Sequence, residues 1–419
     1  MNEIKFIDLF AGIGGIRKGF ENACVEHGLT PKCVFTSEIK PYAIEVLKQN
    51  HPGEKITGDI TKVEAEDIPD FDILLGGFPC QAFSMAGKRL GFEDTRGTLF
   101  FDVARIIKEK RPKGFVLENV EGLVNHDGGK TFEVILETLT KDLGYYVTAQ
   151  ILNAKDFGVA QDRKRIYIVG SDKEAPNFEE FTKTKGKLKD VLESGIEVEH
   201  SEFIDNLVKH IPLEELPGKS VKDKRGGKNN IHSWDLEIKG KVSKDQVNLL
   251  NKMMTERRKK KWAEIYGIDW MDGMPLTLEM IKTFFDSENL EKMLDDLVEK
   301  RYLVKEHPKK KTENGQRIQD ENLPLGYNIV AGKMSFQVNK VLDPEGVTPT
   351  LVAMDMQHLY VVDGPGIRKL TLREGLRLFG YPDDYKFDVD SDDGYDLLGN
   401  TVVVPVIQAV SNRLLDIYC

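Results

Sequence analysis

The pattern of apolar and polar positions changes its period along the chain. Over the first 170 residues, short continuous apolar runs alternate with longer segments whose apolar positions recur every three to four residues. Runs of the first kind are typical of buried strands, and segments of the second kind are typical of amphipathic helices. The predicted strands are Ile4–Phe10, Cys33–Glu38, Lys55–Ile60, Phe71–Phe78, Lys113–Val120, Tyr146–Ala154 and Arg163–Ser171. Strands that alternate with helices predict an α/β fold with a parallel, doubly wound sheet.

The middle of the chain loses this alternation. Between about Ser171 and Asp363 the sequence is charged and irregular. A helical unit is predicted at Leu276–Glu306, and strand-like stretches follow at Tyr327–Asp343 and Thr348–Asp363. This change of rhythm predicts a second, smaller domain.

Helices are again predicted in the C-terminal segment of the chain, residues 366–419. Its last segment, Asn400–Tyr418, has apolar residues at a spacing near 3.6, and such a face needs a partner surface, for which the sheet is the obvious candidate. We therefore predict a first domain over residues 1–175, an inserted domain with a helical insertion over residues 176–365, and a C-terminal segment, residues 366–419, that returns to the first domain.

Composition narrows the class of protein. The 419 residues are 40% hydrophobic and 31% charged, which indicates a globular protein with a real core. No apolar run approaches the roughly 18 residues of a membrane span, and the N-terminal segment lacks a signal-peptide pattern. The four cysteines show neither metal-ligand nor disulfide spacing, so we predict no metal site and a cytoplasmic location. The net charge of −10 argues mildly against nucleic acid, but binding depends on the local face rather than on the total.

The ends of the first three predicted strands carry features of a nucleoside site. Asp8–Gly15 turns from strand to helix through small residues that let a ligand approach the backbone. Glu38 ends the second strand, where an acid can hold a ribose diol, and Asp59 follows the third, where it can accept from an adenine amine. Each acid alone could be a helix cap, and the turn alone could be structural. The third glycine of the dinucleotide fingerprint is absent, which leaves room for S-adenosylmethionine as the cofactor.

The next two strand ends carry a candidate nucleophile and its activator. Cys80 follows the fourth strand and Glu118 ends the fifth, so both are expected at the same edge of the sheet. A thiolate can add to an electron-poor ring once an acid protonates a ring nitrogen, and an apolar wall can raise the pKa of a glutamic acid enough for it to donate. Arg163 and Arg165 supply positive charge that favours the thiolate, although arginines at a strand start are often exposed salt-bridge partners.

Seven segments then share an order and a spacing. They are DLFAGIGG (8–15), GGFPCQAFS (76–84), RGTLFFDVARI (96–106), ENVEGL (118–123), QDRKRIYIVG (161–170), RKLTLREGLRLFGYP (368–382) and GNTVVVPV (399–406). This set resembles the ordered motifs of the DNA (cytosine-5)-methyltransferases of the bacterial restriction–modification type. The resemblance covers the first 170 residues and about the last 55, and implies a Rossmann-like S-adenosylmethionine-dependent methyltransferase sheet with an inserted target-recognition domain.

The resemblance also implies roles for particular residues. Cys80 would add to C6 of a flipped-out cytosine, Glu118 would hold N3 and the exocyclic amine, and Arg165 would contact O2 while Arg163 supports the loop. The implied cofactor residues are Phe10, Ala11, Gly12, Gly14, Ile16, Glu38, Ile39, Asp59, Ile60, Leu99, Asn400 and Val402. Ile16 and Ile39 stand where many relatives have aromatic residues, so a more aliphatic adenine slot is expected.

The expected DNA contacts are spread over the chain. Gln81 and Ser84 lie in the segment that, by the resemblance, covers the DNA, and Thr350 belongs to a Thr-Leu pair of the target-recognition domain. Arg257 and Lys260, in the run RRKKK, are candidates for phosphate contacts, with a solvated helix face as the alternative; the run Lys309–Lys311 is a second candidate.

The predicted function is therefore methyl transfer to C5 of cytosine within a short double-stranded DNA sequence. We expect a monomer, no membrane association, and a cognate restriction endonuclease as a possible partner. Three alternatives remain at this point: a tRNA cytosine-5 methyltransferase with the same motifs, a catalytically dead relative that only binds DNA, and a nucleotide-dependent dehydrogenase. The last leaves Cys80, Glu118 and the C-terminal motifs unexplained.

Overall fold

The computed structural model describes residues 3–79, 99–223, 226–270, 273–312, 314–330 and 336–419. These residues form two compact units. Unit 1 comprises Met1–Glu193, Asp343–Gln357 and Leu370–Cys419, and unit 2 comprises Ser194–Leu342 and His358–Lys369. No described helix has the length and apolarity needed to cross a membrane.

Unit 1 is built on a seven-stranded sheet with the order β3-β2-β1-β4-β5-β7-β6. Its strands are β1 (Glu3–Leu9), β2 (Thr30–Ser37), β3 (Ile56–Thr57), β4 (Ile73–Gly76), β5 (Gly114–Val120), β6 (Tyr146–Asn153) and β7 (Lys164–Ser171). The prediction of a wholly parallel sheet was wrong for one strand, because β7 runs antiparallel to both β5 and β6. The segment between β6 and β7 is too short for the crossover that parallel neighbours need.

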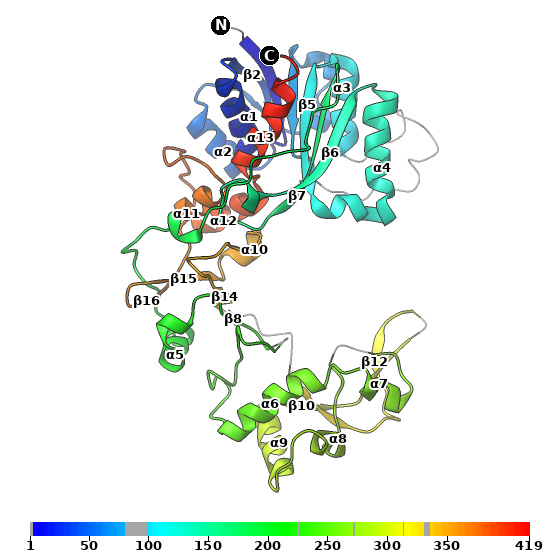
Figure 1. The fold of residues 1–419 in the computed structure, drawn as a ribbon, viewed down its shortest axis with the longest axis vertical. Helices are drawn as coiled ribbons and strands as arrows, with labels where there is room; N and C mark the ends of the chain where they lie inside the picture. The colour runs from blue at the N-terminus through cyan, green and yellow to red at the C-terminus, as the bar shows by residue number, and fades with distance from the viewer. Residues whose placement is uncertain (1–2, 80–98, 224–225, 271–272, 313, 331–335) are drawn as a thin grey trace. The chain divides into compact units, whose positions relative to one another are not determined.

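Helices cover both faces of this sheet (Figure 1). On one face lie α1 (Gly15–Glu26), α2 (Pro41–Asn50) and α13 (Val404–Leu415), and on the other lie α3 (Leu99–Lys110) and α4 (Lys130–Glu137). The apolar C-terminal helix packs on α1, where a Cβ on Gly19 would lie only 2.5 Å from Ile407. The same helix also contacts the sheet, since a Cβ on Gly114 of β5 would lie 2.8 Å from Leu414. The helix begins at Val404, after α11 (Leu372–Leu378) and α12 (Ser391–Asn400).

Unit 2 contains a five-stranded sheet and a helical region. The sheet has the order β16-β15-β14-β8-β9. Its strands are β8 (Ser220–Val221), β9 (Asn230–Ile231), β14 (Lys340–Val341), β15 (Leu359–Asp363) and β16 (Gly366–Lys369), and α5 (Glu202–His210) packs beside them. The predicted strand at Thr348–Asp363 is only partly confirmed, because the short helix α10 (Ala353–Met356) interrupts it.

The helical region of unit 2 has its own apolar core, which includes Trp234, Leu250, Met253 and Leu294. Its elements are α6 (Lys244–Glu256), α7 (Lys261–Tyr266), α8 (Leu278–Lys282), α9 (Leu290–Glu299), the strand pair β10 (Leu303–Glu306) with β13 (Gly326–Ile329), and the hairpin β11 (Lys309–Lys311) with β12 (Arg317–Gln319). The helical unit predicted at Leu276–Glu306 is confirmed for α8 and α9, but its last four residues form β10.

Candidate functional site

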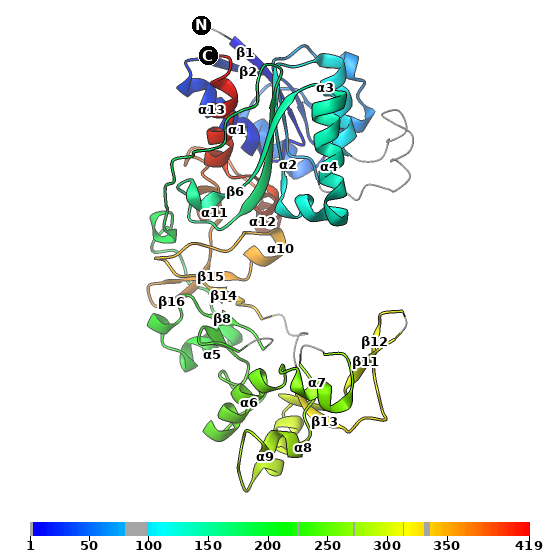
Figure 2. The same ribbon diagram turned by 45° about the vertical axis from the view of Figure 1, so that its right-hand side comes forward.

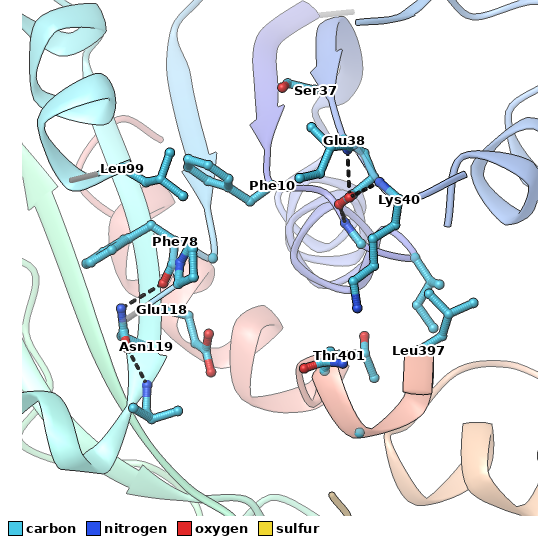
Figure 3. A pocket seen from close by; sticks show the side chains of 18 of the residues that line it. Phe10, Ser37, Glu38, Lys40, Phe78, Leu99, Glu118, Asn119, Leu397 and Thr401 are labelled. Carbon is cyan, nitrogen blue, oxygen red and sulfur yellow. Dashed lines mark hydrogen bonds between the residues drawn. The ribbon is translucent and has the colours of Figure 1, made fainter. Parts of the chain in front are cut away.

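A cavity of about 340 Å³ opens at the carboxyl ends of β1, β2, β4 and β5 in unit 1. This volume lies within the range of small-molecule sites, and the carboxyl edge of an open sheet is where such folds bind ligands. Figure 3 shows Phe10, Glu38, Leu99, Glu118 and Thr401 around this cavity. Its wall therefore combines segments from the beginning, the middle and the end of the chain.

The turn after β1 has a backbone that few side chains could adopt. Phe10, Gly12 and Gly14 have φ values of 56°, 54° and 73°, in the left-handed region. A Cβ on Gly12 would meet no atom within 4 Å, so the backbone of this residue faces open space. Non-glycine residues in this region are rare and concentrate at functional sites, which fits the position of Phe10 on the cavity wall.

Glu38 ties this turn to the end of β2. Its carboxylate accepts hydrogen bonds from the backbone N–H of Gly12 at 2.7 Å, of Ile39 at 2.8 Å and of Lys40 at 2.9 Å (Figure 3). Oε1 accepts two of these hydrogen bonds and Oε2 accepts one, so Oε2 keeps a further lone pair for a ligand hydroxyl. Asp59 lies after β3, where its side chain accepts from the backbone and hydroxyl of Thr61, and these hydrogen bonds lower the pKa of Asp59. Acceptors at two strand ends beside an apolar wall match the polar and apolar parts of an adenosine.

Glu118 is a second buried acid of the cavity, besides Glu38. It lies on β5 and is only 8% exposed. The guanidinium of Arg165, on the antiparallel neighbour β7, approaches it with 3.1 Å between Nε and Oε1. Burial raises the pKa of Glu118 above the usual value of a glutamic acid, and the positive charges of Arg165 and Arg163 oppose that shift. The carboxyl group is thus suited to hold a proton that it can give to a ligand.

Arg163 is 3% exposed and makes hydrogen bonds to the backbone rather than to an acid. Its guanidinium donates to the carbonyls of Leu351 at 2.9 Å, Gly399 at 3.1 Å and Thr401 at 2.8 Å. Burial lowers the pKa of Arg163 to about 10, which still leaves it charged at neutral pH. Arg163 therefore connects the start of β7 to two C-terminal segments by hydrogen bonds. These segments lie about 190 and 240 residues further along the chain.

Most predicted residues of the first domain meet at this cavity. Those that line it are Phe10, Gly12, Glu38, Ile39, Asp59, Ile60, Leu99, Glu118, Arg163, Arg165 and Asn400. Four others lie behind the wall: Ala11, Gly14, Ile16 and Val402. Ile39 is 68% exposed and Ile16 is buried, so of the two substituted positions only Ile39 faces the cavity. Cys80, Gln81 and Ser84 lie outside the described residues.

The remaining predicted contacts are dispersed. The hydroxyl of Thr350 donates to the backbone of Asp162 at 2.7 Å, within unit 1. Arg257, in unit 2, is 5% exposed and donates to Asn328 at 2.7 Å, so its guanidinium belongs to the core of the helical region. A buried guanidinium does not reach a phosphate, and this placement corrects the expectation for Arg257. Lys260 is exposed.

Three polar groups near the cavity were not predicted from the sequence. Asn119 donates to the carbonyl of Phe78 at 2.7 Å and so fixes the segment that leads to Cys80 (Figure 3). A second group joins Asp396 of α12 to Lys40 and Tyr42, at 2.7 Å each. These long-range pairs left no signal in the sequence, because the partners are more than 350 residues apart.

Asp8 is the third missed group. It is fully buried on β1, and neither carboxylate oxygen has a hydrogen-bond partner among the described residues. Burial raises its pKa to about 8, against the opposing charge of Arg17. Its signal was visible in the sequence, since a single acid interrupts the apolar run IKFIDLF.

Comparisons with known proteins agree with this geometry. A family model described as C-5 cytosine-specific DNA methylase matches residues 4–416. The chain is 66% identical to the type II methyltransferase M.NlaIV of Neisseria lactamica and 64% identical to M.NgoBV of Neisseria gonorrhoeae, over 99% of each chain in both cases. The fold is similar to the crystal structure of a putative DNA modification methyltransferase encoded within an E. coli prophage, with a TM-score of 0.53, 20% identity and 99% of each chain covered.

Proposed function

Because the chain belongs to the C-5 cytosine-specific DNA methylases, we propose which of its residues carry out the methylation of cytosine. The protein is a type II DNA (cytosine-5)-methyltransferase of a restriction–modification system that uses S-adenosylmethionine. The observation that carries the residue assignment is the buried Glu118–Arg165 pair, which lies in the same cavity wall as Gly77–Pro79, immediately before Cys80.

The cofactor residues follow from the fit of this cavity to an adenosine. When bound, S-adenosylmethionine supplies an electrophilic methyl group. Glu38 accepts from a ribose hydroxyl and Asp59 from the adenine amine, while Ile39 and Ile60 provide the aliphatic faces of the adenine slot. The methionine end and the lid of the site are assigned to Phe10, Gly12, Leu99 and Asn400, with Ala11, Gly14, Ile16 and Val402 supporting them from behind.

Cys80 is proposed as the nucleophile. The target cytosine leaves the duplex stack at a cost of about a few kcal/mol, and the thiolate adds to C6. Glu118 gives its proton to N3, so that the electron pair of the C5–C6 bond becomes available at C5. C5 would take the methyl group that the cofactor supplies, leaving a neutral thioether. A water or a side chain accepts the C5 proton, the C5–C6 double bond re-forms as the Cys80 thiolate leaves, and N3 returns its proton to Glu118.

The two arginines have separate tasks in this proposal. Arg165 holds Glu118 in place through their 3.1 Å contact and donates to O2 of the base. Arg163 keeps the start of β7 fixed against the C-terminal motifs through its three carbonyl acceptors. Removing Arg165 therefore alters the catalytic acid directly, whereas removing Arg163 loosens the framework of the cavity.

Target recognition is assigned to the inserted part of the chain. We propose a catalytic, cofactor-binding domain over residues 1–175, a target-recognition domain over 176–365, and a returning segment over 366–419. Gln81, Ser84 and Thr350 are proposed to contact the DNA near the target base. The protein acts as a monomer in the cytoplasm, beside an endonuclease that cuts the same unmethylated site.

Bisulfite sequencing of DNA from cells that express the protein tests the function. The expected result is complete protection of one cytosine in every copy of a short sequence, and loss of that protection with Cys80→Ala. If the DNA stays unmodified and a tritium assay shows label transferred to tRNA, the substrate is RNA and the proposed DNA substrate is contradicted.

A further inference from the structure

Two basic runs that are far apart in the sequence meet in the helical region of unit 2. The first run, Arg258–Lys261, ends at the first residue of α7, and the second, Lys309–Lys311, forms β11. Trp270 joins them. Its indole N–H donates to the carbonyl of Arg258 at 2.9 Å, and its own carbonyl accepts from the guanidinium of Arg317, on β12, at 3.2 Å.

The hairpin of β11 and β12 concentrates positive charge on one side. Lys311 lies directly opposite Arg317 in the antiparallel register, and Lys309 lies opposite Gln319 on the same face. Like charges in directly opposite positions destabilise a strand pair, and a two-stranded hairpin has little stability to spare. Figure 2 shows the hairpin extending from the side of α7. The repulsion between these charges lowers the stability of the hairpin, and a bound anionic partner would offset that repulsion.

Neighbouring acids neutralise only part of this charge. Lys259 pairs with Glu256 at 2.6 Å and Lys310 with Asp320 at 3.1 Å. Among the residues that the structure describes, Lys260, Lys311 and Arg317 have no acid within 4 Å, and all three are exposed. These three residues and Trp270 are called the basic hairpin surface below.

We propose that the basic hairpin surface binds phosphates of duplex DNA without reading bases. This inference rests on the proposed DNA substrate and adds a binding surface that the catalytic assignment does not contain. A duplex presents one phosphate charge per about 1.7 Å of its axis, which matches several close cations better than an isolated acidic side chain does. The net charge of −10 gives the chain no overall attraction to DNA, so phosphate contacts depend on local positive surfaces such as this one.

The test is a salt titration with the full-length protein and a short random-sequence duplex. Lys311→Gln/Arg317→Gln removes two charges from the basic hairpin surface. Lys282→Gln/Lys292→Gln removes two charges from α8 and α9 and serves as the matched control. The plot of log affinity against log salt should become less steep by about 1.8 for the hairpin variant, and affinity at low salt should fall on the order of tenfold. The control should keep the wild-type slope.

Two further readouts separate this role from a structural one. Removing a like-charge pair should leave the melting temperature unchanged or raise it, so a lower affinity does not come from unfolding. Trp270 is 41% exposed, whereas Trp234 and Trp262 are 1% and 3% exposed. DNA binding should therefore change mainly the Trp270 fluorescence, and Trp270→Phe should abolish that change.

The outcomes for this surface and for the proposed function are distinct. A wild-type slope in the hairpin variant, with cytosine methylation intact, overturns the surface and leaves the function. If the salt slope of the hairpin variant is reduced only on the target sequence of the enzyme and not on random DNA, the proposal is also overturned, because the residues then read bases. If the hairpin variant has a reduced slope on random DNA but the wild-type protein methylates no cytosine, the surface is supported and the proposed function is contradicted.

Discussion

Two segments of this chain, residues 163–165 and 257–261, consist wholly of arginine and lysine and have different surroundings. Each contains one buried arginine: Arg163 donates to three backbone carbonyls, and Arg257 donates to Asn328. The difference lies in a second residue of each segment. Arg165 faces the buried acid Glu118 in a cavity, whereas Lys260 faces solvent. A buried arginine therefore does not mark a site by itself, and the group that its neighbour faces decides the function.

Glu118→Gln should give the largest effect and tests the cavity side of this comparison. An amide cannot give a proton to N3, so kcat should fall by about 10²- to 10⁴-fold while the cofactor still binds in calorimetry. Because the pKa of Glu118 is raised, its proton is held at lower pH and lost as pH rises. Wild-type kcat should therefore decline on the alkaline side, and the variant should lack that decline.

The matched control for this variant is Glu121→Gln. Glu118 lies on β5 and Glu121 directly follows that strand, but Glu121 is half exposed and pairs with Lys164 at 3.8 Å. Its removal should leave kcat unchanged. Equal losses in the two variants would mean that any charge change at this edge of the sheet is damaging, and the special role of Glu118 would be withdrawn.

Arg163→Met and Arg257→Met compare the two buried arginines directly. Each leaves buried carbonyl or amide acceptors without their donor, so the free energy of unfolding should drop by about 2–4 kcal/mol in both. At a temperature where both variants are folded, only Arg163→Met should also weaken cofactor binding and lower kcat. A loss of catalysis with Arg257→Met at a temperature where it is folded would contradict the separation of the two regions.

Asp8→Asn asks whether the buried acid of β1 is neutral. Its pKa is raised from 3.8 to about 8 in the folded protein, so the folded state binds more protons than the unfolded state between those values. Stability should therefore decrease as pH rises from 4 to 8, and the asparagine variant should lose this part of the decrease. The gain in melting temperature over wild type should grow with pH, whereas Asp70→Asn, at an exposed position, should show no such trend. A constant difference would mean that Asp8 is charged at neutral pH.

Asp396→Asn should give the smallest effect. The contacts of Asp396 with Lys40 and Tyr42 join α12 to the start of α2 at the cavity wall, but both charges are partly exposed. We expect cofactor affinity to fall about two- to fivefold, on the scale of exposed ion pairs. Asp383→Asn removes a similar contact, to Arg377, away from the cavity and should not change affinity.

The sequence predicted unit 1 far better than unit 2, for a physical reason. In the α/β part, strands and helices have distinct periods, and polar residues at strand ends converge because the sheet brings those ends to one edge. This reasoning brought Glu38, Asp59 and Glu118 to one cavity. It missed the antiparallel β7, because the direction of a strand depends on its connection and not on its own residues.

Unit 2 offered no such rule. Its strands are two to five residues long, and its helices are held by an apolar core assembled from distant segments. The run RRKKK predicts one exposed cluster, yet in the folded protein Arg257 of this run is buried and Lys260 is exposed. Charge alone does not tell these positions apart. The cross-chain contacts of Asn119 and Asp396 were equally invisible, since each depends on a partner that only folding brings near.

Covalent trapping tests the central claim most directly. A duplex with 5-fluorocytosine at the target position blocks loss of the C5 substituent, so the bond between Cys80 and C6 should persist. With cofactor present, wild-type protein should give a DNA–protein adduct that survives denaturing electrophoresis, and Cys80→Ala should give none. No adduct with the wild-type protein, or an equal adduct with Cys80→Ala, would contradict the account.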